Sequence, residues 1–271
     1  MSSKYIADLK TTGPVFKDSL NILKRLYKLN SIEKLEDELF ERNLLLKASK
    51  RRIQNVYGSI KKRYISNITN EDIANNPLLL IINHISDEEA IKILYYHLCL
   101  SDKLIYDFVV NTVYPRYIKG FLGVSNTDSE NFLIKSSETH EEMKSWSERT
   151  YKDLKSALIT VLLETELLKN RKNTVFNEAL YISNKVFGYL LYSNKEKIKT
   201  IADLNNNDDF KLLLLDKTDR KLLLKELENT GVVYLNDDGK ETNVEYLFPS
   251  LKEYVANYVV GKDRENKKHD F

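Results

Sequence analysis

The sequence predicts a mainly α-helical fold with three parts: an N-terminal three-helix unit like a helix-turn-helix, a central helical bundle, and a C-terminal helical unit with a β-hairpin that resembles a winged helix. Apolar residues recur at helical spacing through most of the chain. The 271 residues include only 8 Gly and 4 Pro, which favours long helices with few tight turns. Two β-rich runs flank Asp238-Gly239 near the C-terminus, which predicts a hairpin.

The first unit, residues 1–70, is expected to hold three helices. The first spans Val15 to Leu29, and Ser31 is the expected N-cap of a second helix from Ile32 to Phe40. A third helix is expected from Lys47 to Tyr64. Its predicted buried face repeats at helical spacing through Ile53, Val56, Tyr57, Ile60 and Tyr64.

The central part, residues 71–172, is expected to be a helical domain. Helices are predicted from Asp87 to Leu100, from Asp102 to Ile118, and from Glu148 to Lys169. Ser147 is the expected N-cap of the last of these helices.

The C-terminal part, residues 173–271, combines helices with the hairpin. We expect helices from Tyr181 to Tyr192 and from Asp219 to Asn229, with a loop at Asn205–Asp209 between them. The hairpin strands are expected at Val232–Leu235 and Val244–Phe248.

Charge is distributed unevenly along the chain. Residues 1–64 hold 15 Lys and Arg against 7 Asp and Glu, whereas the remainder holds 27 against 33. The stretch from Asn43 to Asn70 contains no acidic residue and seven basic ones. This asymmetry indicates one positively charged unit in a chain that is otherwise neutral to acidic.

The expected third helix therefore presents a basic face opposite its apolar face. Arg and Lys neutralise phosphates, and Arg, Asn and Gln can contact base edges in two places at once. The predicted DNA-binding residues are Lys47, Lys50, Arg51, Arg52, Gln54, Asn55, Ser59, Lys61, Lys62 and Arg63. Three alternatives stay open: a solvated helix face, an acidic protein partner, and RNA in place of DNA.

Signatures of catalysis and of metal binding are missing from the sequence. We find no phosphate-binding glycine loop, no Gly-x-Ser-x-Gly elbow, and no His-x-x-x-His or Cys-x-x-Cys spacing. His97 lies in an apolar stretch and is expected to be a core histidine, and the single Cys99 a buried thiol. We therefore expect a protein that is not an enzyme, with no cofactor and no metal.

The sequence also predicts a cytoplasmic protein without a membrane contact. The N-terminus lacks the apolar segment of a signal peptide. The longest uninterrupted apolar run, Leu78–Ile82, is far shorter than the ~20 residues of a membrane-spanning helix.

Several segments resemble the BrxA family of BREX (bacteriophage exclusion) phage-defence systems. The resemblance covers roughly residues 4–170 and is carried by Glu41–Lys47, by Tyr114–Tyr117, and by Trp146–Thr150 with the Leu-rich helix that follows to Leu168. It implies a helical protein that binds double-stranded DNA without catalysis. It also implies partners in the same system: a methyltransferase, an ATPase and a phosphatase-like protein.

Two functional hypotheses follow from the residues and the resemblance together. The first is a DNA-binding accessory protein that contacts phosphates through Lys47–Arg63. The alternative is a protein–protein interaction scaffold of the same defence complex.

Overall fold

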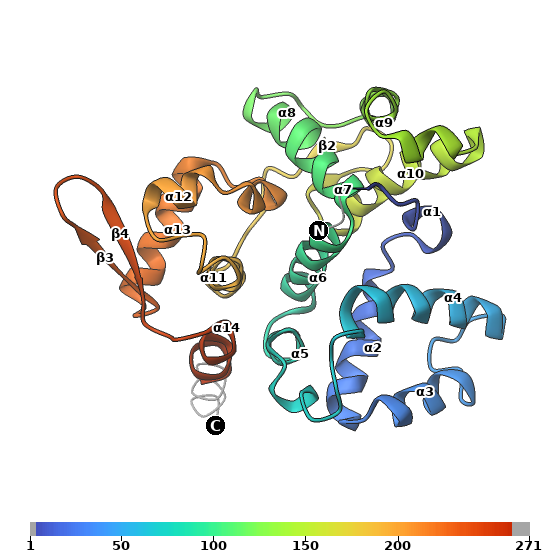
Figure 1. Ribbon diagram of the computed structural model, residues 1–271, viewed down its shortest axis with the longest axis horizontal. Helices are drawn as coiled ribbons and strands as arrows, with labels where there is room; N and C mark the ends of the chain where they lie inside the picture. Colours follow the sequence, from blue (N-terminus) through green and yellow to red (C-terminus); the bar gives the residue numbers. More distant parts are fainter. Residues whose placement is uncertain (1–3, 262–271) are drawn as a thin grey trace. The chain divides into compact units, whose positions relative to one another are not determined.

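The computed structural model describes residues 4–261, and it is mainly helical with two small antiparallel sheets (Figure 1). This confirms the predicted fold class. Within the described residues, contacts divide the chain into two compact units. Unit 1 holds residues 4–22, 32–67 and 94–180, and unit 2 holds the rest. This division does not coincide with the expected boundaries near residues 70 and 172, since α2 (Phe16–Leu29) and α6 (Asp87–Ser101) contribute residues to both units.

Unit 1 consists of helices and one short sheet. Besides parts of α2 and α6, its helices are α1 (Leu9–Thr12), α3 (Ile32–Phe40), α4 (Lys50–Ile60), η1 (Lys61–Ile65), α7 (Lys103–Phe108), η3 (Val109–Val113), α8 (Tyr114–Ile118), α9 (Asn126–Ser137), η4 (Glu141–Ser145) and α10 (Glu148–Glu164). Strands β1 (Leu168–Lys169) and β2 (Val175–Phe176) pair antiparallel, with Leu168 opposite Phe176.

The helix expected from Asp102 to Ile118 has a π-helical turn in its middle. Asp102 caps α7 by accepting a hydrogen bond from the Leu104 amide at 3.1 Å. The wide turn of η3 then lies directly before Tyr114-Pro115. Pro115 has no N–H to donate to the carbonyl four residues earlier, so the regular α-helical ladder cannot continue unchanged here.

The helix expected to reach Lys169 ends earlier, at Glu164. Ser147 caps its start as predicted, accepting a hydrogen bond from the Thr150 amide. At the other end, Glu166 takes a left-handed backbone conformation with φ of 59°, which a helix cannot accommodate. The prediction was wrong at this end, and Lys169 belongs to strand β1.

Unit 2 holds the C-terminal helices and the hairpin. Its helices, besides the rest of α2 and α6, are η2 (Ile73–Asn75), α5 (Pro77–Asn83), α11 (Asn184–Ser193), α12 (Ile201–Asn206), η5 (Asp208–Leu213), α13 (Lys217–Asn229), α14 (Leu251–Glu253) and η6 (Tyr254–Val260). The loop expected at Asn205–Asp209 is instead the end of α12 and the start of η5. The Asn207 side chain caps η5 by accepting a hydrogen bond from the Asp209 amide at 2.9 Å.

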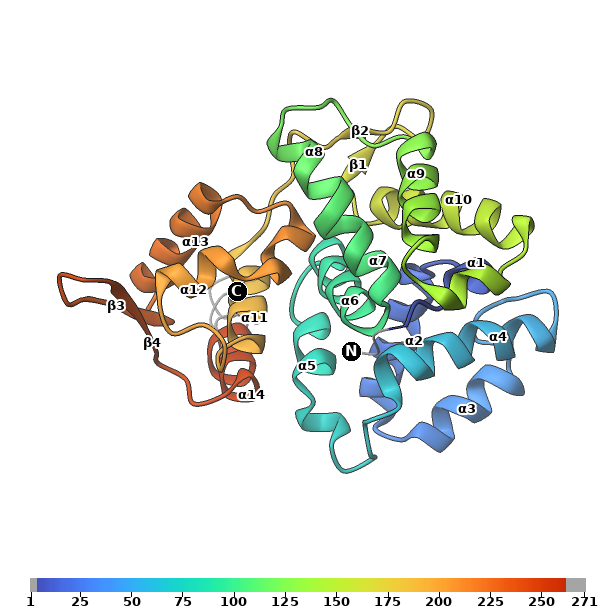
Figure 2. The same cartoon turned by 45° about the horizontal axis from the view of Figure 1, so that its top comes forward.

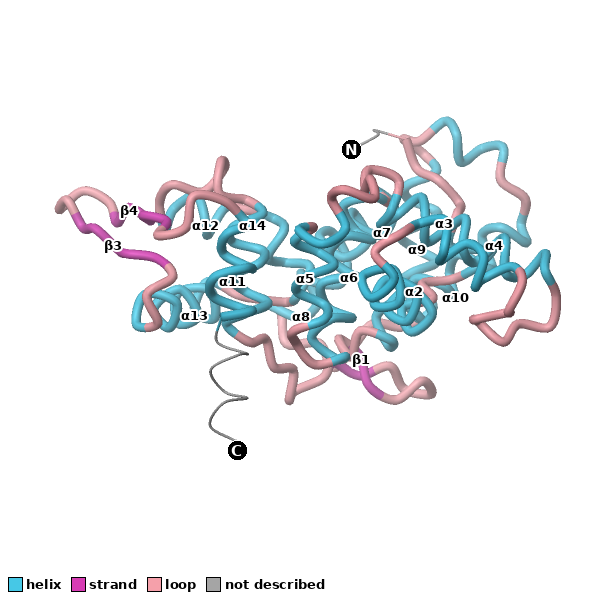
Figure 3. The backbone as a smooth tube through the Cα atoms, turned by 90° about the horizontal axis from the view of Figure 1, so that it is seen from below, coloured by secondary structure: helices cyan, strands magenta, loops and turns pink. Residues whose placement is uncertain are grey.

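The predicted hairpin is confirmed as strands β3 (Val233–Asp237) and β4 (Thr242–Tyr246), with Val233 opposite Tyr246 (Figure 3). A bridge between Thr200 and Asn243 adds the residues before α12 to the other side of β4. Figure 2 shows α11, α12 and α13 gathered beside this hairpin.

A fully buried arginine organises the helices of unit 2. Arg220, on α13, donates a hydrogen bond to the Leu215 carbonyl and three more to carbonyls of Leu204, Asn205 and Asn207 at 2.9 to 3.1 Å. The carbonyls of Leu204, Asn205 and Asn207 lie at the end of α12 and just beyond it, where helix carbonyls lack partners of their own. One side chain therefore fixes the connection between α12 and α13.

Cys99 and His97 both lie on α6. Cys99 is buried, as predicted, and His97 is half-buried, where desolvation lowers its pKa to about 4. Among residues 4–261, no helix combines the length and the apolar character that crossing a membrane requires.

Candidate nucleic-acid interface

The predicted basic helix is α4, which continues into the π-helical turn η1. Its apolar face is buried as expected, through Ile53, Val56, Tyr57, Ile60 and Tyr64. Ser49 caps the helix by accepting a hydrogen bond from the Arg52 amide at 3.2 Å. At the far end, the Ser66 hydroxyl donates to the Lys61 carbonyl at 2.7 Å. The ten predicted site residues therefore all lie in unit 1, with Lys47 just before the helix.

The lysines of this face are paired with carboxylates. Lys61 Nζ lies 2.8 Å from Glu36, Lys47 Nζ lies 2.9 Å from Asp18, and Lys62 pairs with Asp8. Lys50 lies 3.8 Å from Glu41, and both of these side chains are about three-quarters exposed. The basic face predicted from the acid-free stretch is therefore interrupted by carboxylates. The reason is tertiary, because the acidic partners come from outside the acid-free stretch.

Two of the three arginines bind the backbone of the N-terminal segment. Arg52 Nη1 donates to the Thr11 carbonyl at 3.2 Å. Arg63 Nη1 donates to the carbonyls of Gly13 and Pro14, each at 3.2 Å, and its Nη2 is buried without a partner in the described structure. Both side chains hold this segment against α4 and η1.

Arg51 is different from the other two arginines. Its side chain is exposed, and no hydrogen bond or ion pair holds it within residues 4–261. The structure gives exposed positions to Gln54 and Asn55 as well, three and four residues further along the same helix. Ser59 instead contacts the Thr12 hydroxyl at 3.0 Å and is turned toward α1.

These residues form what we call the α4 stripe: Arg51, Gln54, Asn55, Gly58 and Lys62, which follow the exposed side of the helix. A Cβ added at Gly58 would meet open space, so the middle of the stripe is sterically accessible. The exposed basic face is thus narrower in the structure than the sequence predicted. Of the ten predicted residues, Lys47, Ser59 and Arg63 are only half-exposed and hold other parts of the fold.

Of the seven cations in residues 47–63, four lysines pair with carboxylates, and within residues 4–261 the three arginines form no ion pair, so cations outnumber their paired carboxylates around this helix. The hydrogen bond from Lys61 lowers the pKa of Glu36, so this carboxylate stays charged at neutral pH. Exposed ion pairs contribute about 0 to 1 kcal/mol, so a phosphate can replace the carboxylate at a lysine without unfolding the helix.

The connection between α3 and α4 also differs from the sequence expectation. In Figure 1 the two helices lie side by side, and they contact each other. Residues 41–49 join them. That segment is longer than the turn of about three to four residues that typifies a helix-turn-helix.

Two groups of basic residues were missed by the sequence reasoning. Lys169 lies in β1, where the sequence predicted the end of a helix, and Arg171 and Lys172 lie in the β1–β2 turn. Lys217, Lys221 and Lys225 follow one another at four-residue spacing on α13. That spacing was visible in the sequence and is the signal that could have identified the second group.

The described residues offer no constellation for metal chemistry. Among residues 4–261, no three His, Cys, Asp or Glu side chains gather where they could hold a metal ion. The arrangement around α4 can instead attract an anion, contact phosphates, and place one arginine and two amides against a polar surface.

Comparisons with known proteins identify similar sequences and a similar fold. A protein of Bacillus cereus (strain H3081.97), named BREX protein BrxA, is 26% identical over 100 residues. This alignment covers 37% of the chain and half of that relative's length. The crystal structure of an uncharacterized protein from Magnetospirillum magneticum has the same fold, with a TM-score of 0.59 at 15% identity. It covers 78% of this chain and 98% of the crystallised one.

The family model named BrxA matches residues 3–194, which include the whole of α4 and η1. This match extends over more than half of the chain. It also reaches beyond the segments in which the sequence resemblance was found, to the end of α11. The chain therefore belongs to the BrxA family.

Proposed function

We propose that this protein is a DNA-binding accessory component of a BREX phage-defence system, without catalytic activity of its own. The observation that carries DNA binding is the α4 stripe, in which the exposed Arg51 stands beside two exposed amides within a local positive excess. The relative named BREX protein BrxA supports the assignment to such a system and to partnership with its other components. A DNA partner implies action in the cytoplasm.

In this proposal, α4 contacts duplex DNA mainly through phosphates. Arg51 and Lys62 are exposed, and the ion pair of Lys50 with Glu41 is long enough at 3.8 Å to exchange readily. Binding is then dominated by counterion release and should weaken steeply as salt rises. Sequence preference would come only from Arg51, Gln54 and Asn55, the side chains that can contact base edges.

We also propose that unit 2 contains a winged helix. Three helices, α11, α12 and α13, are followed by the β3–β4 hairpin, and the Thr200–Asn243 bridge supplies the short third strand of that architecture. The third helix, α13, exposes Lys217 and Lys221. The hairpin tip carries Asp237, Asp238 and Glu241, which would repel phosphates, so a DNA contact of this unit would use the helix and not the hairpin.

A second candidate function is a protein-interaction scaffold of the same defence complex. The hairpin region favours it, because Tyr234 and Leu247 are each 54% exposed near the base of the hairpin. Exposed aromatic side chains such as Tyr234 are enriched at protein interfaces. Affinity capture of defence partners with and without nuclease separates the two candidates, since partners of a scaffold remain bound after the DNA is digested.

The decisive experiment measures anisotropy of a labelled duplex at several salt concentrations. The variant R51Q/R52Q/K61Q/K62Q removes four positive charges without creating new carboxylates. Its matched control, K28Q/K144Q/K197Q/K252Q, removes four exposed lysines elsewhere and has the same net charge.

We expect the α4 variant to lose most of its affinity for duplex DNA while the control keeps it. Equal affinity of the two variants would overturn the assignment of the site, because only net charge would then matter. Absence of salt-dependent duplex binding by the unmodified protein would overturn DNA binding itself. Single-stranded DNA and RNA in parallel titrations identify the preferred nucleic acid.

A further inference from the structure

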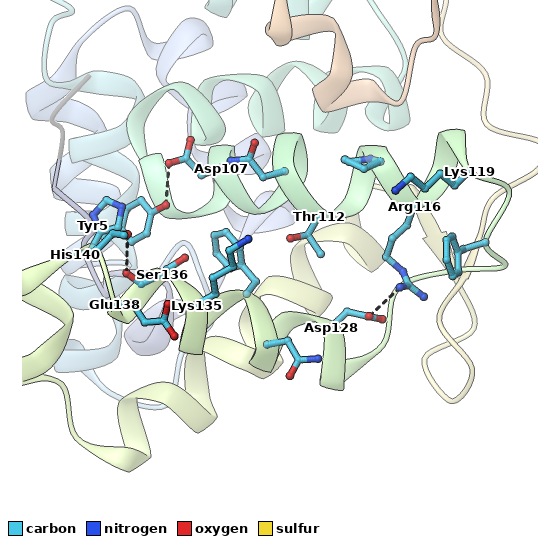
Figure 4. Close-up of a pocket in the computed structure, with 16 residues that line it drawn as sticks. Tyr5, Asp107, Thr112, Arg116, Lys119, Asp128, Lys135, Ser136, Glu138 and His140 are labelled. Carbon is cyan, nitrogen blue, oxygen red and sulfur yellow. Dashed lines mark hydrogen bonds and ion pairs between the residues drawn. The ribbon is translucent and has the colours of Figure 1, made fainter.

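A polar groove of about 770 Å³ lies in unit 1 and shares no residue with the α4 stripe (Figure 4). One wall is formed by the helical segment that runs from α7 through η3 to α8. The other wall is α9. The volume falls within the roughly 300 to 1,000 Å³ that is typical of ligand sites.

Side chains in this groove have hydrogen-bonding capacity that the protein does not use. Asn111 and Lys119 project from the first wall, and Asn131 and Lys135 from α9. Within residues 4–261, none of these four side chains takes part in a hydrogen bond or an ion pair. The groove therefore offers two amides and two cations to a ligand.

The first wall has an unusual backbone at this point. Asn111 lies in the π-helical turn η3, whose Val109, Val110 and Val113 are buried. Single π-helical turns are uncommon and occur frequently at functional sites, because the widened turn redirects side chains. Here the turn leaves Asn111 exposed toward the groove while its three valines stay in the core.

Aromatic rings lie at both ends of the groove. At one end, the Tyr5 ring stacks on His140 with centroids 3.7 Å apart, and the Tyr5 hydroxyl donates to Asp107 at 2.8 Å. At the other end, the Arg116 guanidinium lies 4.3 Å from the centre of the half-exposed Phe121 ring. Tyr5 is buried behind His140, so Phe121 and the partly exposed His140 are the rings on which a base can stack.

Most of the carboxylates in the groove are already bound by the protein. Asp128 pairs with Arg116 at 3.0 Å, and Asp107 pairs with Lys103 at 2.7 Å. Glu138 is exposed at the end where Tyr5 and Lys135 lie (Figure 4). Lys119 lies at the opposite end from Lys135 (Figure 4). The two cations are thus separated by a neutral, amide-lined middle.

We infer that this groove binds a dinucleotide unit, whose phosphates are bound by Lys119 and Lys135 and whose bases contact the amides and rings of the groove. The unit comes either from an unpaired nucleic-acid strand or from a free dinucleotide. Amide side chains bind base edges, and lysines bind phosphates, so each part of the groove has a counterpart in this ligand. The inference is independent of duplex binding by α4, because the two surfaces share no residue.

The test is calorimetric titration with the 5′-phosphorylated thymidine dinucleotide pTpT, with TpT, which lacks the terminal phosphate, and with a ten-residue thymidine strand. The groove variant K119A/K135A is compared with K144A/K197A, which removes two exposed lysines outside the groove. Thermal unfolding of both variants checks that the fold is intact.

We expect saturable binding of pTpT, weaker binding of TpT, and a loss of about ten-fold or more in K119A/K135A while the control is unchanged. Tighter binding of the ten-residue strand than of pTpT identifies the unpaired strand as the source. The variant E138Q should bind pTpT more tightly, because it removes a carboxylate near Lys135.

Three outcomes would overturn the inference: no saturable binding of any of the three probes, equal binding by K119A/K135A and its control, or binding of inorganic phosphate as tight as that of pTpT. Duplex anisotropy of K119A/K135A keeps this result separate from the proposed function. If the groove fails as a site, duplex binding by α4 is untouched, and the reverse also holds.

Discussion

The carboxylate of Glu36 accepts a hydrogen bond from Lys61 Nζ at 2.8 Å, and the same oxygen accepts another from the Tyr57 hydroxyl at 2.8 Å. Glu36 lies on the acidic helix α3, and Lys61 lies at the start of η1. This contact joins the two helices and at the same time withdraws positive charge from the face proposed to contact DNA.

Neutralising Glu36 should therefore strengthen DNA binding. In E36Q the amide keeps a hydrogen bond to Tyr57 or Lys61, while one negative charge near the phosphates is lost. We expect duplex affinity to rise by about three-fold at low salt. Anisotropy titration measures this change, with E196Q in unit 2 as the control for net charge. A weaker or unchanged duplex affinity in E36Q would contradict a contact between the DNA phosphates and Lys61.

Arg51 should account for a measurable part of the salt dependence. Because its side chain is exposed and forms no hydrogen bond or ion pair within the described residues, R51Q should leave the free energy of unfolding unchanged. Each phosphate contact contributes about 0.9 to the slope of log affinity against log salt, so the slope should fall by about that amount. K28Q is the matched control, and an equal slope in both variants would remove Arg51 from the interface.

Arg220 should be essential for the stability of unit 2. Replacing Arg220 by Met removes the guanidinium and leaves four carbonyl oxygens without their buried donor. This should lower the free energy of unfolding by about 3 kcal/mol or more. Urea denaturation measures the loss. R220K should restore only part of it, because an ammonium cannot reproduce the geometry of the guanidinium. The neighbouring exposed change K221A should stay within about 0.5 kcal/mol, and a similar cost for both would refute the role assigned to Arg220.

Asp102 should make stability depend on pH in the acidic range. Burial raises the pKa of its carboxyl to about 6, above the ordinary value of 3.8. Between these two values the folded protein binds more protons than the unfolded chain, so this group's contribution to stability falls as pH rises from about 4 to 6. The stabilisation by protonated Asp102 is fully present below pH 4 and is lost as the pH rises through about 6, the pKa of Asp102 in the folded protein.

The variant D102N keeps a capping side chain without the charge. Relative to the unmodified protein, it should gain about 2 to 3 kcal/mol between pH 4 and pH 7. Comparing the two proteins by urea denaturation cancels the opposite contribution of His97, whose lowered pKa makes stability rise with pH over a similar range. A difference between the two proteins that does not change with pH would show that the Asp102 carboxyl titrates normally.

The sequence by itself determined most of the local structure. Apolar periodicity located α3, α4 and their buried faces, and Ser147 marked the start of α10, because helix formation depends on neighbours a few residues apart. The same locality located the hairpin strands at Val233–Asp237 and Thr242–Tyr246 within two residues of expectation.

Only the tertiary structure decided which charges face solvent. The acid-free stretch suggested an open cationic face, yet Asp8, Asp18 and Glu36 reach it from other elements, and the backbone at residues 11–14 binds Arg52 and Arg63. The groove between η3 and α9 was likewise invisible, since its amides and lysines come from two segments that are separate in sequence. Electrostatic and hydrogen-bond partners depend on distance in space, and no local pattern encodes that distance.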